Sequence, residues 1–347
     1  MWGDCTMELD ARKRKVLEAI VIDYIATAEP VGSRTIARKY DLGVSPATIR
    51  NEMADLEEMG LIEQPHTSAG RVPSDAGYRY YVDCLMEKTA IAQEAKTLIE
   101  KSFQTKIKQL EDLIQLSLKI LSQMTSYTSL VLAPQFGKST LQLIQLMFVE
   151  PGKALIVVVT DSGRIENRIV DIPESVTKTD LEIVSKVLND KFKGLPVKDW
   201  EKAILKEVRA QLVKQHKVLS LALELINTLL NEETDDKVYL AGALNILNQP
   251  EFKDISKVKN IFQLLENEDV VCSMLKDESE DGIQVKIGHE NKHESIKECS
   301  IITATYKLEG RILGTIGLLG PTRMQYSQAM SILEFLTETL SLAIKRL

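Results

Sequence analysis

Apolar residues near the N-terminus recur every three or four positions and predict three helices in succession. The first covers residues 9–27. We expect Ser33 to cap a second, short helix that ends at a glycine-containing turn, residues 41–44. Ser45 then caps a third helix that starts at Pro46, where the missing N–H costs nothing. Two short helices joined by a tight turn are typical of a helix-turn-helix.

The third helix has two distinct faces. Its apolar face, expected in a core, carries Ile49, Met53 and Leu56. Its opposite face carries Ala47, Arg50, Asn51 and Ala54, flanked by Thr48. Small residues let a helix approach DNA closely, and Arg and Asn make bidentate contacts to guanine and adenine edges in the major groove. An ordinary amphipathic helix with a solvated polar face is the alternative.

The next stretch predicts a winged helix. Residues 61–63 predict a short strand, and residues 65–73 form a turn-rich loop with one arginine. Such a hairpin holds phosphates or probes the minor groove beside the recognition helix. The wing candidates are His66, Thr67, Ser68 and Arg71. An ordinary loop position is the alternative for His66, and Arg71 is the stronger candidate.

Five motifs give the chain a specific resemblance. They are residues 29–35, 45–53 (SPATIRNEM), 56–62, 66–73 (HTSAGRVP) and 77–83. Together they resemble the HrcA family of heat-inducible transcription repressors, densely over the first 85 or so residues.

The resemblance implies a function and partners. The chain is expected to repress class I heat-shock operons, such as those of GroEL and DnaK, by binding double-stranded DNA at an inverted-repeat operator (CIRCE) as a homodimer. Heat would relieve repression, with the chaperonin GroEL as modulator of the active form. A ligand-sensing winged-helix regulator of metabolic genes is the alternative.

Beyond the head, the pattern predicts an α+β multidomain chain. The expected helices are 74–87, a long one at 90–124, and 179–192, 200–214, 218–230, 255–265 and 326–345. The expected strands are 126–133, a three-stranded antiparallel meander (143–149, 154–159, 164–172), then 238–247, 283–289, and a hairpin of 300–308 with 311–319.

These elements divide into three domains. Residues 1–88 form the winged helix-turn-helix DNA-binding domain. By resemblance, residues 89–139 and 236–347 form a GAF-like α/β domain, and residues 140–235 form an inserted α+β dimerising domain.

The DNA-binding candidates follow from these positions. For base contact we expect Ala47, Thr48, Arg50 and Asn51. For phosphate contact we expect Ser33, Arg34, Thr35, Arg38, Lys39 and Ser45. Arg50→Ala should relax specificity, whereas Lys39→Ala should weaken binding to all sequences alike.

Charge qualifies this expectation. The formal net charge is −7, and residues 1–88 hold 11 Lys and Arg against 15 Asp and Glu, although DNA-binding domains are usually basic. Between residues 32 and 50, however, four cations oppose only Asp41. We therefore expect a basic face with an acidic rear, and binding that depends strongly on salt.

Other chemistry finds little support in the sequence. No apolar run reaches the ~18 residues of a membrane span, so the expected location is the cytoplasm, associated with the nucleoid. His289 and His293 have the spacing of helical metal ligands, but the surrounding polar stretch favours a solvated connection. With no GxSxG motif or other polar catalytic cluster, we expect neither an enzyme nor a cofactor or metal. An enzyme with an accessory DNA-binding domain is the weaker alternative.

Overall fold

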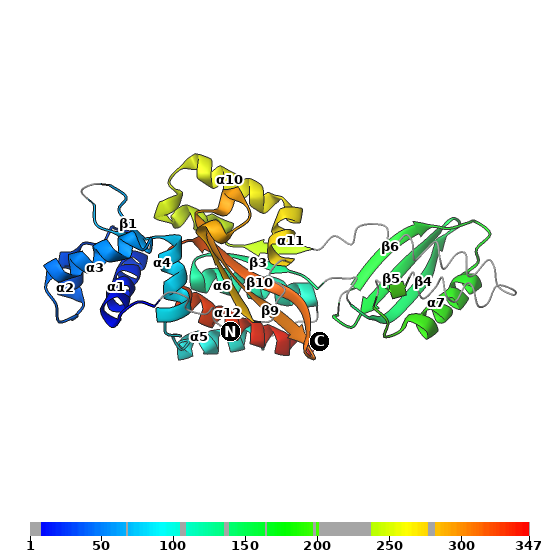
Figure 1. The fold of residues 1–347 in the computed structure, drawn as a ribbon. Coiled ribbons are helices and arrows are strands. Elements are labelled where there is room, and N and C mark those ends of the chain that lie inside the picture. Colours follow the sequence, from blue (N-terminus) through cyan, green and yellow to red (C-terminus); the bar gives the residue numbers. More distant parts are fainter. Residues whose placement is uncertain are drawn as a thin grey trace.

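The computed structural model describes residues 8–66, 69–104, 109–134, 139–163, 165–196, 199–200, 237–276 and 282–346. Figure 1 shows three parts in a row: a small helical part with a hairpin at one end, a five-stranded sheet with helices on both faces in the middle, and a three-stranded sheet at the other end. The predicted α+β multidomain fold with an N-terminal winged helix is therefore confirmed.

The winged helix forms the N-terminal head of the molecule. Its elements are α1 (Ala11–Thr27), α2 (Ser33–Lys39), α3 (Pro46–Glu58), β1 (Ile62–Glu63) and β2 (Val72–Pro73). β1 and β2 pair antiparallel and make the wing. Apolar side chains of all three helices meet in a core that includes Leu17, Ile20, Ile36, Ile49 and Leu56.

The predicted capping residue is confirmed at α3 but not at α2. Ser45 Oγ accepts from the backbone N of Thr48 over 3.1 Å, as predicted. The prediction that Ser33 caps α2 is wrong, because Gly32 is the capping residue and Ser33 is already the first helical residue. The carbonyl of Gly32 accepts from the backbone N of Thr35 and of Ile36, so the helix begins one residue early.

The helix predicted at 74–87 has two parts. An α-helix, α4 (Asp75–Tyr80), continues as a π-helical turn, Tyr81–Leu85. Ser74 caps α4 by accepting from the backbone N of Gly77 over 3.1 Å. Tyr78 and Tyr81 of this segment are buried.

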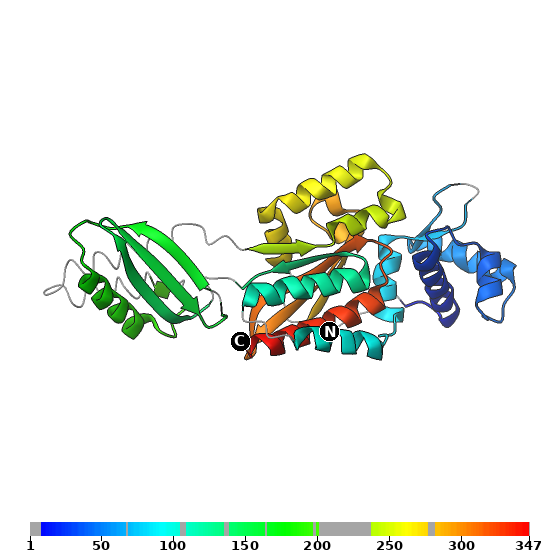
Figure 2. The same cartoon turned by 180° about the vertical axis from the view of Figure 1, so that it is seen from behind.

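The central part is an antiparallel sheet between two helical layers. Its strand order is β7-β3-β10-β9-β8. The strands are β3 (Thr128–Leu132), β7 (Val238–Ala241), β8 (Ile283–Ile287), β9 (Cys299–Leu308) and β10 (Arg311–Pro321). The helices are α5 (Gln93–Phe103), α6 (Leu110–Thr125), α10 (Ile255–Glu266), α11 (Glu268–Lys276) and α12 (Tyr326–Ile344). In Figure 2, α5, α6 and α12 cover one face of the sheet, and α10 and α11 lie on the other side.

The single long helix predicted at 90–124 is wrong. The structure has two helices there, α5 and α6, and both contact α12. A straight helix of that length would extend about 50 Å, whereas α12 extends about 28 Å, so one continuous rod could not lay both of its ends against α12. Burial against a shared partner overrides a continuous amphipathic pattern.

Two other predictions for the central part need correction. The strand predicted at 238–247 ends at Ala241 and continues as a 3₁₀ helix, Ala243–Asn248. Helix α11 was not predicted. The hairpin of β9 and β10 is confirmed. Gly314 allows close strand packing there, since a Cβ on it would lie 2.2 Å from the carbonyl oxygen of Leu132.

The third part contains the predicted meander. β4 (Leu141–Glu150), β5 (Lys153–Thr160) and β6 (Ile165–Asp171) pair in that order, and α7 (Lys178–Phe192) packs on one face. Their buried side chains form an apolar cluster that is separate from the apolar clusters of the head and the central part. The predicted helices at 200–214 and 218–230 lie outside the described residues, apart from Trp200.

Candidate nucleic-acid interface

The polar face of α3 is free to contact a ligand. Ile49, Met53 and Leu56 are buried against the head, as the pattern predicts. Ala47, Arg50 and Asn51 are exposed, and Thr48 is half-buried beside the cap. Ser45 Oγ lies 3.0 Å from Thr48 Oγ1, so the first turn of the helix is fixed. The small side chains of the exposed Ala47 and Ala54 allow this face of the helix to lie close to the base edges in a DNA groove.

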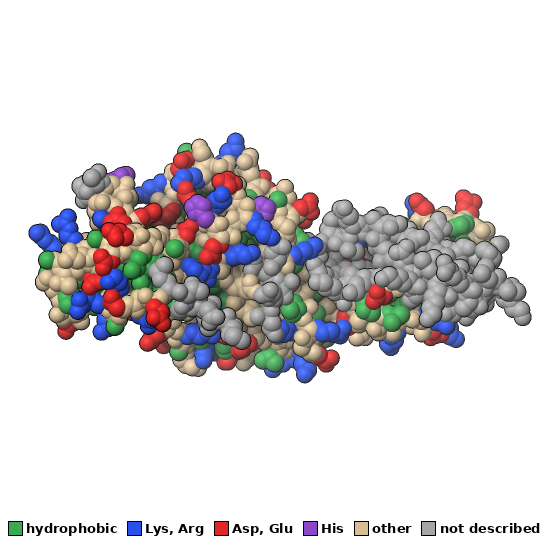
Figure 3. All heavy atoms as spheres, viewed as in Figure 1, with side chains coloured by type: hydrophobic (Ala, Val, Ile, Leu, Met, Phe, Trp, Pro, Cys, Tyr) green, Lys and Arg blue, Asp and Glu red, His purple; other side chains and the backbone are tan. Residues whose placement is uncertain are grey.

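Three arginines of this region have unpaired guanidinium groups. Arg34, Arg38 and Arg50 are exposed and form no ion pair or side-chain hydrogen bond with a described residue. Figure 3 shows Lys and Arg side chains projecting at the end of the molecule where α2 lies. These exposed arginines agree with the predicted basic face, and α2 lies at the end of the molecule remote from the central sheet.

Lys39 lies in a different environment from these arginines. Its Nζ is 2.5 Å from Oδ1 of Asp23, a side chain on α1 that is only 8% exposed. The ion pair joins α2 to α1. Because Lys39→Ala would leave the Asp23 carboxylate buried and unpaired, Arg38 gives the cleaner test of a phosphate contact.

Two acidic residues of α3, Glu52 and Asp55, pair with α1. Lys13 Nζ lies 2.9 Å from Oε2 of Glu52 and 2.9 Å from Oδ2 of Asp55. Arg12 also reaches Glu52, over 3.3 Å. Hydrogen bonds that the Lys13 ammonium donates to the carboxylates of Asp55, Glu52 and Asp10 raise the pKa of Lys13 above its usual value. These carboxylates are therefore neutralised on the rear of α3, which explains how an acidic domain can present a basic face.

The wing is fastened at Arg71. Its backbone exchanges two hydrogen bonds with Val31, of 2.8 and 2.9 Å, and its guanidinium contacts Glu57 of α3. His66 is exposed near the tip, and Thr67 and Ser68 lie outside the described residues. The structure thus brings Ser33, Arg34, Thr35, Arg38 and Lys39 of α2 together with α3, while Arg71 is partly occupied by a carboxylate.

Comparisons with known proteins agree with this geometry. The family described as "Winged helix-turn-helix transcription repressor, HrcA DNA-binding" matches residues 8–82, and "HrcA protein C terminal domain" matches residues 111–330. The heat-inducible transcription repressor HrcA of Pelotomaculum thermopropionicum is 50% identical over 342 residues, covering 98% of both chains. That of Desulfitobacterium hafniense is 51% identical over 337 residues, covering 96% of this chain and 97% of the relative. The chain belongs to the HrcA family.

A solved structure shares this fold over nearly the whole chain. A crystal structure described as a hypothetical protein at 2.2 Å resolution superposes with a TM-score of 0.66, at 24% sequence identity, and covers 98% of this chain and 99% of that one. Family membership makes this protein a transcription repressor with a DNA-binding winged helix.

Sequence reasoning missed the residues that position this HrcA head. Glu52, Asp55, Glu57 and Asp23 hold the cations of α1, α2 and the wing, but none was a candidate. A signal was present, because Glu52 and Asp55 are three residues apart and so lie on one side of a helix. Their partners are distant in the chain, and the sequence alone does not identify them.

Proposed function

We propose that the protein represses chaperone operons by binding an inverted-repeat DNA operator of the CIRCE type as a homodimer. The observation that carries this is the exposed face of α3, where the side chains of Arg50 and Asn51, like those of Arg34 and Arg38 on α2, have no partner among the described residues. In this proposal Ala47, Thr48, Arg50 and Asn51 face base edges in the major groove. Arg34, Arg38 and the polar residues Ser33, Thr35 and Ser45 face phosphates, and the wing residues lie beside them.

The test compares the affinity of the protein for a duplex with the inverted repeat and for the same duplex with one arm scrambled. Fluorescence anisotropy measures both affinities. Arg50→Ala should weaken binding to the intact repeat by about 1–3 kcal/mol and reduce the difference in affinity between the two duplexes. Arg38→Ala should weaken both duplexes alike and reduce the salt dependence. An unchanged preference in Arg50→Ala would remove Arg50 from base recognition.

The homodimer is supported by an apolar surface on the three-stranded sheet. On the face away from α7, Leu143 is 45% exposed, Met147 42%, Ile165 54% and Ile169 64%. Apolar residues grouped in this way on a sheet indicate a protein interface. In an isologous dimer the same face of each copy meets the other, and the two heads are then related by a two-fold axis, as an inverted repeat requires.

Regulation by heat is supported by the family alone. We propose that GroEL promotes the active repressor, and that client proteins occupying GroEL on heating withdraw this help. Adding GroEL to the duplex assay should raise the fraction of DNA-binding protein, and an unchanged fraction would contradict this part of the proposal. The protein would act in the cytoplasm, at the nucleoid. None of the described helices is both long and apolar enough to span a membrane.

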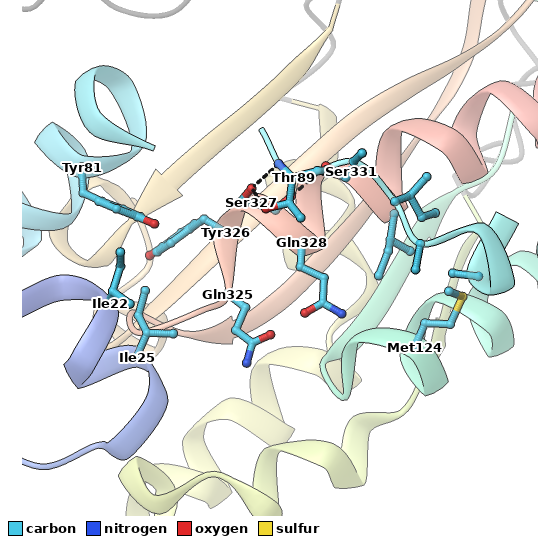
Figure 4. Close-up of a pocket in the computed structure, with 15 residues that line it drawn as sticks. Ile22, Ile25, Tyr81, Thr89, Met124, Gln325, Tyr326, Ser327, Gln328 and Ser331 are labelled. Atoms are coloured by element: carbon cyan, nitrogen blue, oxygen red, sulfur yellow. Dashed lines mark hydrogen bonds between the residues drawn. The ribbon is translucent and has the colours of Figure 1, made fainter. Parts of the chain in front are cut away.

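A ligand-sensing role has one observation in its favour. A cavity of about 440 Å³ lies between α1, the residues that come after the head, and α12. Figure 4 shows Ile22 and Ile25 on one side, Met124 on another, and the amides of Gln325 and Gln328 at its border. A ligand-dependent rise in melting temperature, lost in Ile22→Trp, would favour it. Among the described residues no cluster suits a metal, and we propose no catalytic role.

A further inference from the structure

A turn of the central part contacts the head directly. The head comprises residues 8–85, and the body is the five-stranded sheet with its helices. Arg79 of α4 donates from Nε to Oε1 of Glu290 over 2.8 Å and from Nη2 to Oε2 over 2.5 Å. It also donates to the carbonyl of Val285. The stretch around His289, expected to be a solvated connection, is therefore partly occupied by an interdomain contact.

A second pair stands beside the first. Oδ2 of Asp75, at the start of α4, accepts from the backbone N of His289 over 2.9 Å and lies 2.7 Å from its Nδ1. The approach depends on Gly288, whose φ is +54°, because a Cβ there would lie 2.0 to 2.3 Å from the Asp75 carboxylate. Glycine is the residue that combines this backbone angle with so close a contact.

Apolar packing continues across the same boundary. One core cluster runs from α1 and α3 of the head to α12 of the body. The rings of Tyr78 and Tyr326 meet at 6.1 Å between centroids. The chain leaving the head is fixed to α12, since Ser327 Oγ accepts from the backbone N of Thr89 over 2.7 Å. The head is therefore mounted on the body and does not hang from a free linker.

The packing alone does not fix the angle of the head. The boundary also contains the cavity of about 440 Å³, which is lined by Ile22 and Ile25 of α1 and by residues of α12 (Figure 4). A partly filled apolar boundary allows rocking, whereas a forked arginine–carboxylate contact has a defined geometry. The polar contacts at Arg79 and Asp75, together with the hydrogen bond that Arg323 Nη1 donates to the carbonyl of Ile25 on α1 over 3.0 Å, are thus the ones that define orientation.

We propose that Asp75, Arg79, His289 and Glu290 form a head–body lock that orients the recognition helix and matches the two heads of the dimer to the spacing of the operator arms. This rests on the proposed function. The lock does not cover the DNA-binding face, because Arg50 and Asn51 are exposed while it is closed. Fixed heads present the second recognition helix at a high effective concentration once the first is bound, and loose heads lose this gain.

The test compares Arg79→Met with Asp83→Asn. Arg79 also pairs with Asp83 inside the head, over 3.1 Å, so Asp83→Asn removes that pair and keeps the lock. We expect Arg79→Met to bind the two-arm duplex about tenfold more weakly than the wild type and the one-arm duplex with an affinity within about twofold of the wild type. The variant should also discriminate less among operators whose spacer differs by one or two base pairs. Asp83→Asn should match the wild type. Unchanged or tighter two-arm binding by Arg79→Met, or equal loss on both duplexes, would overturn the proposal.

A second variant and a second measurement separate the lock from DNA binding itself. Glu290→Gln weakens the lock from the body side, and Glu294→Gln, whose carboxylate pairs only with Lys297 among the described residues, is its control. Trypsin cleavage after Lys88 reports release of the head without DNA. It should be several-fold faster in Arg79→Met and Glu290→Gln than in either control. Equal cleavage rates in the variants and their controls would overturn the proposed lock. Failure of the wild-type protein to bind the operator duplex would contradict only the proposed function.

Discussion

The guanidinium of Arg71 and the carboxylate of Glu57 join the wing to the recognition helix. Arg71 donates to Oε2 of Glu57 from Nε over 2.9 Å and from Nη2 over 2.7 Å. The side chains are 21% and 35% exposed, so the pair is shielded in part from solvent. Two donors on one carboxylate fix an angle as well as a distance. The wing is therefore held against α3 before any DNA is present.

Because Arg71 and Glu57 act through one contact, removing either side chain should change operator binding in the same direction. We expect Arg71→Ala and Glu57→Ala each to weaken operator binding by about three- to tenfold, and the double variant to be no worse than either alone, because both remove one interaction. Fluorescence anisotropy on the two-arm duplex measures it, with the exposed neighbour Glu58→Ala as control. Tighter binding by Glu57→Ala would show instead that Glu57 restrains a phosphate-contacting arginine.

Local signals in the sequence were enough to find the head and the meander. The capping Ser45, Pro46 and the turn before them depend on residues adjacent in the chain, and so do the hairpin turns between β4, β5 and β6. The face of α3 that carries Arg50 followed from helical periodicity. Such features survive folding because they need no distant partner.

Features that depend on distant partners could not be predicted. The separation of α5 from α6 comes from their common packing on α12, and the pairing of Arg79 with Glu290 joins residues 211 positions apart. A polar, glycine-containing stretch such as 288–293 looks solvated in sequence whether or not another domain covers it. Ion pairs that orient the head are of this kind, so candidates chosen by exposure alone miss them.

Gly77 should resist a substitution that usually helps a helix. Gly→Ala inside a helix gains up to about 1 kcal/mol, but here a Cβ would lie 1.9 Å from the carbonyl oxygen of Leu61 in the wing. Backbone cannot move aside as a flexible side chain does, so we expect Gly77→Ala to destabilise the head by about 1–3 kcal/mol. Thermal unfolding measures this, with Ala76→Ser on the exposed side of α4 as control. A raised melting temperature would show that α4 is not seated on Leu61.

A charge on the outer face of the three-stranded sheet should split the proposed dimer. Ile169 is 64% exposed, so Ile169→Asp costs the folded monomer little, but in an isologous interface it buries two like charges close together. We expect sedimentation velocity to give a monomer at concentrations where the wild type is a dimer, with the melting temperature of the head unchanged. Ile255→Asp, at a residue 83% exposed on α10, is the matched control and should stay dimeric. A dimeric Ile169→Asp would place the interface elsewhere.

The last prediction concerns pH. Partial burial, with the nearby Glu87 carboxylate, raises the pKa of Glu18 on α1 above its usual value. A carboxyl with a raised pKa in the folded state favours folding only while it is protonated, so its contribution is lost as pH rises from the unfolded pKa through the folded one.

Glu18→Gln is always neutral and escapes this loss. Its melting temperature should therefore equal that of the wild type near pH 4 and exceed it increasingly toward pH 7, by an amount worth less than about 1 kcal/mol, because the site is only partly buried. Differential scanning fluorimetry across this range measures the difference. Glu58→Gln, at an exposed position on α3, serves as control and should show no such trend. A variant less stable than the wild type at pH 7 would mean that the Glu18 carboxylate is stabilised in the folded head.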